Sequence, residues 1–175
     1  MTKTIASLLV LLAGCATPTV GWTPVVPASL AVPSSQVLSL RARAVGVQIY
    51  ECGMRRDDPR RAEWIFKAPE AELFSRIGEK IGKHYGGPTW ESNDGSKVVG
   101  EVKAQVAGPD SGAIPWLLLN AKSTSGTGVF SQTKSIQRVY TVGGKAPTEP
   151  CSQAQAGKVT RVGYKAMYYF YVAKR

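Results

Sequence analysis

The sequence predicts an all-β fold: an antiparallel β-sandwich or a partly closed β-barrel of roughly eight or nine strands, with at most a short helical turn. Apolar side chains recur at every second position from Val37 onward, which is the period of a strand and not of a helix. Turns rich in Gly, Pro, Ser and Asp separate these runs. The 175 residues, 43% hydrophobic and 19% charged, fit one small domain plus a tail and exclude a coiled coil, a collagen-like repeat and a multi-domain enzyme.

Local sequence signals predict where the turns and strands lie along the chain. Asn93-Asp94-Gly95 is a hairpin signal, because an Asp-Gly pair tolerates the positive φ angles of tight turns. The stretch 69–77 has two glutamates near its start and Gly78 after it, so it is where a helical turn is expected. Strands are expected at 37–50, 62–67, 88–91, 97–106, 115–121, 128–142 and 159–172.

Alternation also predicts which side chains share a face of the sheet. On the second arm of the hairpin, one face is expected to hold Val98, Gly100, Val102, Ala104 and Val106. On the last strand, one face is expected to hold Val162, Tyr164, Ala166, Tyr168, Phe170 and Val172.

The N-terminus has the pattern of an export signal. Lys3 precedes an apolar run, 4–12, that is too short to cross a bilayer, which takes about 20 residues. Leu12-Ala13-Gly14-Cys15 resembles the bacterial lipobox. The resemblance implies that 1–14 is a signal peptide, that cleavage precedes Cys15, and that Cys15 carries diacylglycerol and a further acyl chain. Two or more acyl chains are needed because a single acyl chain binds membranes only marginally. An ordinary secretory signal followed by a chance cysteine is the alternative.

A proline-rich tether, 15–36, is expected between the lipid and the β domain, 37–175. Ala16 after the cysteine, where Asp would retain the protein in the inner membrane, matches the sorting rule for the outer membrane. Loss of the leader removes only Lys3 from the basic residues, so the formal charge falls from +10 to +9. Partners are therefore expected in the cell envelope: the membrane itself through the lipid, and anionic lipid headgroups, wall polymer or a small ligand through the domain. Nucleic acid is not expected for an exported protein whose basic residues are spread along the chain.

Cys52 and Cys151 form an even pair in an exported chain, and such a pair is expected to be a disulfide. The alternative is two buried thiols.

Known catalytic motifs are missing from the chain. Each Gly-Lys pair lacks the Ser or Thr that completes a phosphate-binding loop, and neither a dinucleotide fingerprint nor a Gly-x-Ser-x-Gly elbow occurs. Ser131-Gln132-Thr133-Lys134 matches Ser-x-x-Lys, but it lies in a strand-like run and lacks the partner motif Lys-[Ser/Thr]-Gly.

His84 is the only histidine, so no metal site and no cofactor is expected. Two interpretations of His84 remain. It either forms a weak metal site with Glu91 and Asp94, or it makes an ordinary hydrogen bond in a loop.

One stretch, 84–91 with the sequence HYGGPTWE, is distinctive, and DGSKVVG follows it at 94–100. Together they resemble the signature of DUF3455, a family of exported bacterial and fungal proteins without an established activity. The resemblance extends through GVQIYEC at 46–52, WIFKAPEA at 64–71, IPWLLL at 114–119, GTGVF at 126–130, SIQRV at 135–139, TVGG at 141–144 and YYFY at 168–171.

Two interpretations of the signature remain open. The first is a non-catalytic binding module, in which aromatic and polar groups form a ligand site made of His84, Tyr85, Trp90, Glu91, Trp116 and Arg138. The second is structural: Trp90 and Trp116 are core residues, and Arg138 pairs with Glu91 or Glu51. An enzyme of unknown reaction, with a site around His84, Trp90 and Glu91, is a further alternative, although no nucleophile and base stand at a known spacing.

Overall fold

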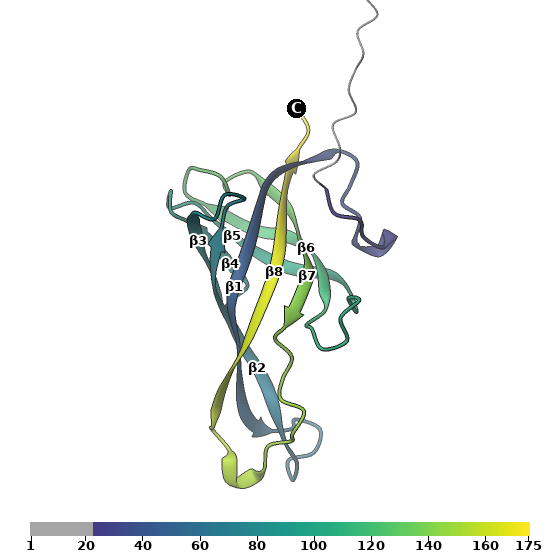
Figure 1. The fold of residues 1–175 in the computed structure, drawn as a ribbon, viewed down its shortest axis with the longest axis vertical. Helices are drawn as coiled ribbons and strands as arrows, with labels where there is room; N and C mark the ends of the chain where they lie inside the picture. Colours follow the sequence, from purple (N-terminus) through teal and green to yellow (C-terminus); the bar gives the residue numbers. More distant parts are fainter. Residues whose placement is uncertain (1–22) are drawn as a thin grey trace, which may run out of the picture.

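The computed structural model describes residues 23–175 (Figure 1). The predicted signal peptide, 1–14, the lipidated Cys15 and the first part of the tether lie outside the described residues. Eight strands and two short 3-10 turns make up the described chain. They are η1 (Ala28–Leu30), β1 (Gln36–Met54), β2 (Ala62–Phe74), β3 (Lys80–Tyr85), β4 (Thr89–Ser92), β5 (Lys97–Val106), β6 (Trp116–Ser125), β7 (Thr133–Gly143), η2 (Gln153–Gln155) and β8 (Val159–Ala173).

The strands form a single antiparallel sheet in which each strand pairs with the next and β8 pairs back with β1, so the sheet closes into a barrel. This confirms the all-β antiparallel prediction. Among the described residues, no helix is long and apolar enough to cross a membrane.

The interior of the barrel holds the main core, which we call the inner cluster. Rings from strands on opposite sides of the sheet meet there: the ring centroids of Trp90 in β4 and Tyr168 in β8 are 5.2 Å apart. Gly100 makes room for this packing, because a Cβ atom at that position would lie 2.9 Å from the Trp90 ring. Tyr164, Ala166, Tyr168 and Phe170 all belong to the inner cluster, as their alternation predicts. Val162 and Val172, predicted for the same face, are only partly buried and lie outside that cluster.

A second core lies on the outside of the barrel, and we call it the outer cluster. Its buried members are Leu30, Trp116, Leu118, Val139, Tyr169 and Tyr171. Leu30 belongs to η1, so the described end of the predicted tether packs against the barrel (Figure 1). The Leu30 carbonyl accepts a hydrogen bond from Gln137 Nε2 at 2.6 Å, and the Tyr171 hydroxyl donates to Gln137 Oε1 at 2.6 Å.

The face predicted for the hairpin arm is only half right. Val98 packs in the inner cluster and Val102 faces the same interior, but Ala104 and Val106 pack against the outer cluster. The pairing explains the change, because Val102 pairs with Leu119 and Ala104 with Leu118, which leaves Lys103 as an extra residue. Such a β-bulge shifts the phase of the side chains.

The helical turn predicted at 69–77 is wrong, because β2 continues to Phe74. Pro69 is tolerated inside this strand for a geometric reason. It pairs with Gln48 of β1, while the pairing of β2 with β3 starts only at Ala71, so Pro69 lies at a free edge where no N–H is needed.

The far end of the barrel, at the bottom of Figure 1, is formed by the extended ends of β1, β2 and β8. The Cys52–Cys151 disulfide, predicted from the sequence, ties the loop before η2 to β1 at this end. Backbone hydrogen bonds reinforce the connection, since the Cys52 amide donates to the Lys158 carbonyl at 2.8 Å and the Gly157 amide donates to the Cys52 carbonyl at 2.8 Å.

Candidate functional site

A cavity of about 310 Å³ lies inside the barrel, next to the inner cluster. Every one of the eight strands contributes at least one side chain to its wall. The lining residues are Gln48, Phe66, Lys67, Pro69, His84, Gly87, Pro88, Trp90, Val102, Leu117, Leu119, Arg138 and Tyr168. Eight-stranded barrels have interiors of about the size that holds one small ligand, and small-molecule sites start near 300 Å³.

His84 is stacked between aromatic rings in the wall of the cavity. Its ring lies 4.4 Å from that of Trp90 at an interplanar angle of 10°, and edge-on to Tyr168 at 5.2 Å. Nδ1 is 2.8 Å from the Thr89 carbonyl oxygen, which can only accept, so Nδ1 carries the proton and Nε2 is left as an acceptor. Burial lowers the pKa of His84 to about 3, so the ring is neutral at physiological pH.

Several buried polar atoms around the cavity have no hydrogen-bond partner among the described residues. They are Gln48 Nε2, Trp90 Nε1 and the hydroxyl of Tyr168, all in its wall, together with the hydroxyl of Tyr164. The two hydroxyls interact with each other, and that of Tyr168 with Arg138, without the geometry of a formed hydrogen bond. The residues Gln48, Trp90 and Tyr168 are only 2%, 1% and 1% exposed. A buried polar group without a partner costs about 1–3 kcal/mol, and native proteins contain few of them, so a group of them around one cavity calls for an explanation.

Arg138 brings a positive charge to the same cavity. Its Nε and Nη2 donate to the Pro115 carbonyl at 3.2 and 2.8 Å. Neither Glu91 nor Glu51 pairs with it, contrary to the structural interpretation of the sequence: Glu91 pairs with Lys83 and Lys97, and Glu51 with Lys67. In the part of the chain that the structure describes, Arg138 has no carboxylate within salt-bridge distance. The positive charge of Arg138 opposes the rise that burial causes in the pKa of Tyr168.

Three of the side chains that line the cavity are also exposed at the protein surface. We call Phe66, Lys67 and Val102 the rim; Phe66 is 49% and Val102 51% exposed. Lys67 is a bulge residue, because Tyr50 pairs with Phe66 and the preceding Ile49 with Ala68. Its amine forms a 3.3 Å ion pair with Glu51. Bulges are common at barrel rims, where they redirect a side chain.

Of the six predicted ligand-binding residues, the structure brings three together at the cavity: His84, Trp90 and Arg138. Tyr85 and Glu91 lie on the other face of the sheet, because they alternate with His84 and Trp90 along β3 and β4. The Tyr85 hydroxyl donates to Glu91 Oε2 at 2.8 Å, and this bond lowers the pKa of Glu91.

Trp116 is also away from the cavity. It belongs to the outer cluster, where its ring lies edge-on to Tyr140 at a centroid distance of 5.3 Å. The structural interpretation is therefore right for Trp116, while Trp90 is both a core residue and a wall of the cavity.

Among the polar side chains of the cavity, sequence reasoning missed Gln48, Lys67 and Tyr168 as site residues, although it placed Tyr168 on the predicted face of the last strand. Gln48 continues the inward phase of Ala42 and Ala44 along β1, so the phase of the strand could have revealed it despite its polarity. Nothing in the local sequence marks Lys67, because a bulge changes the pairing without changing the residue pattern. The strand β3, which carries His84, was also not predicted.

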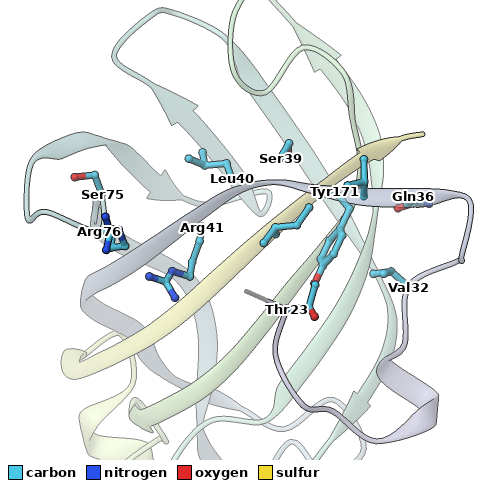
Figure 2. Close-up of a pocket in the computed structure, with 11 residues that line it drawn as sticks. Thr23, Val32, Gln36, Ser39, Leu40, Arg41, Ser75, Arg76 and Tyr171 are labelled. Carbon is cyan, nitrogen blue, oxygen red and sulfur yellow. The ribbon is translucent and has the colours of Figure 1, made fainter. Parts of the chain in front are cut away.

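A second, larger hollow of about 660 Å³ lies where the N-terminal segment meets β1 (Figure 2). Its lining includes Thr23, Val32, Leu40 and Arg41 (Figure 2). Two of its polar groups already have protein partners: Ser39 Oγ donates to the Phe170 carbonyl at 3.0 Å and the Tyr171 hydroxyl to Gln137 Oε1. Gln36 Oε1 is a buried atom without a partner among the described residues, so this hollow has one such atom in its lining, against three in the wall of the interior cavity.

No three His, Cys, Asp or Glu side chains within residues 23–175 come together in a way that could hold a metal ion.

These features define an all-β domain with a small polar and aromatic cavity inside a closed sheet. Comparison with protein-family models places residues 33–172 in DUF3455, a family of proteins of unknown function, and the chain belongs to this family. The curated proteins contain no match to the chain, and neither do the solved structures.

Proposed function

We propose that the protein is a lipid-anchored envelope protein, held in the outer membrane through Cys15, whose β domain binds a small organic molecule in the interior cavity. The observation that carries the binding role is the group of unpartnered buried atoms on Gln48, Trp90 and Tyr168 around a cavity of about 310 Å³. A ligand with hydrogen-bonding groups would satisfy them, and its apolar part would lie against Leu117 and Leu119.

An enzyme with a site at His84, Trp90 and Glu91 finds less support. Glu91 lies on the opposite face of the sheet from His84, so the two cannot act on the same bound molecule. With a pKa near 3, His84 is also a weak base, whereas a catalytic base works best with a pKa near the working pH.

The binding role is tested by blocking the rim of the cavity. Val102→Trp adds bulk at a position that is 51% exposed and lines the cavity, and Val159→Trp is a matched control, 54% exposed and outside it. Benzyl alcohol, benzamide and benzoate serve as small probes in saturation-transfer NMR. We expect at least one probe to bind the unmodified domain and the control variant and to lose binding in Val102→Trp. Equal binding to both variants, or no binding of any probe to the unmodified domain, would contradict the proposal.

A further inference from the structure

The charge of the cavity wall is one-sided. Of its lining side chains, Lys67 and Arg138 are cationic and none is acidic. Lys67 has a carboxylate partner in Glu51. Among the described residues Arg138 has no carboxylate partner: it donates to the neutral Pro115 carbonyl and interacts with the neutral Tyr168 hydroxyl. A partly buried guanidinium without a counterion keeps an unfavourable desolvation cost that a bound anion would offset.

The hydrogen-bonding capacity that remains in the wall consists mostly of donors. A guanidinium has five N–H groups, and two of those of Arg138 donate to Pro115, which leaves up to three, one of them near the Tyr168 hydroxyl. Trp90 Nε1 and Gln48 Nε2 are donors only, and the Tyr168 hydroxyl is able to donate. The neutral His84, whose Nδ1 bonds the Thr89 carbonyl, keeps Nε2 as an acceptor.

The rest of the wall is apolar and narrow. Leu117 and Leu119 come from β6, and Phe66 and Val102 stand at the rim. A volume of about 310 Å³ is that of roughly ten water molecules, so the ligand is a small molecule and not a lipid chain or an oligosaccharide.

Resting on the binding role proposed above, we infer that the ligand is a small monocarboxylic acid. Its carboxylate docks on Arg138, with Trp90 Nε1 and Gln48 Nε2 as further donors, and its apolar body lies against Leu117 and Leu119. Arg138 thus acts as the residue that selects an anion over a neutral molecule of the same shape.

The test compares benzoate with benzamide, which have nearly the same shape but differ in charge. Dissociation constants are measured by calorimetry or ligand-observed NMR for the unmodified domain, for Arg138→Gln and for the control Arg60→Gln, whose side chain is 91% exposed. We expect benzoate to bind the unmodified domain and the control at least about tenfold more tightly than benzamide, because hydrogen bonds to charged groups carry that much affinity. Arg138→Gln removes the difference.

The outcomes separate the two proposals. Equal affinity for benzoate and benzamide in the unmodified domain would overturn the carboxylate inference while leaving the cavity as a binding site. A preference for benzoate that survives in Arg138→Gln would overturn the role of Arg138. Binding of neither probe would contradict the proposed function as well. The comparison in the unmodified domain decides the main point even where Arg138→Gln fails to fold.

Discussion

The surroundings of His84 determine its protonation state. The ring is enclosed by Trp90 and Tyr168, and burial holds its pKa near 3, well below the usual 6.5. The folded protein therefore keeps His84 neutral over a range of pH in which the unfolded chain takes up a proton.

A pH dependence of stability follows from this shift. Because the pKa of His84 is lower in the folded than in the unfolded state, stability is fully present above pH 6.5 and is lost as the pH falls toward 3. We expect the free energy of unfolding to fall by up to about 1.4 kcal/mol per pH unit in this window. Urea unfolding of the unmodified protein and of His84→Gln at several pH values measures this change in the free energy of unfolding. The variant, which can still donate to the Thr89 carbonyl, should show a flatter dependence, and parallel curves would contradict the assignment.

At the scale of residues, the sequence predicts chemistry better than location. The signature contains His84 and Trp90, which do meet at the cavity, but also Tyr85 and Glu91, which cannot join them because neighbours in a strand face opposite ways. Gln48 was missed because a polar side chain is normally assigned to the solvent face, whereas here it is 2% exposed.

At the scale of elements, alternation located most of the strands but not the irregularities between them. Residue ranges were predicted for seven of the eight strands, while the short β3 was not located. Extra residues at Ser39, Lys67 and Lys103 shift the pairing of β1 with β8, β1 with β2, and β5 with β6. Each register shift changes which side chains face inward. The shifts cannot be found from the residue pattern of one strand, because each depends on how that strand pairs with its neighbour. The outer cluster exists partly because of such shifts.

The segment around η1 is expected to add stability to the barrel. Leu30 is fully buried in the outer cluster, so Leu30→Ala leaves a cavity there and should lower the free energy of unfolding by about 2–3 kcal/mol, the lower part of the usual range for buried leucines. Val25→Ala in the same segment is the control, because Val25 is 87% exposed. Thermal unfolding followed by circular dichroism compares them; an equal effect of the two substitutions would show that the segment does not stabilise the fold.

At the scale of the whole molecule, the disulfide closes the end of the barrel opposite the C-terminus of β8. Cys52 and Cys151 are 99 residues apart, and a crosslink of that span stabilises a fold by up to about 4.7 kcal/mol in the chain-entropy model. This matches a domain proposed to work in an oxidising envelope. The sequence could predict this pair because the compartment and the even number of remaining cysteines both point to it.

Anchoring is tested by removing the proposed lipid site. Cys15→Ser prevents thioether formation, so we expect the variant to remain unprocessed or to appear in the soluble fraction of the envelope. Detergent phase partitioning and mass spectrometry of the N-terminus measure this. Membrane retention of normally processed Cys15→Ser protein would contradict the lipoprotein assignment.

The central claim, that the barrel interior binds a ligand, is tested most directly through the four tryptophans of the chain. Each indole N–H gives one signal in a two-dimensional ¹H–¹⁵N NMR spectrum, assigned by Trp→Phe substitution. Trp64 Nε1 already donates to the Glu149 carbonyl at 3.1 Å, Trp116 belongs to the outer cluster, and Trp90 Nε1 has no partner among the described residues. Titration with benzoate should therefore shift the Trp90 signal and leave those of Trp64 and Trp116 in place. An unchanged Trp90 signal at saturating benzoate would contradict the account.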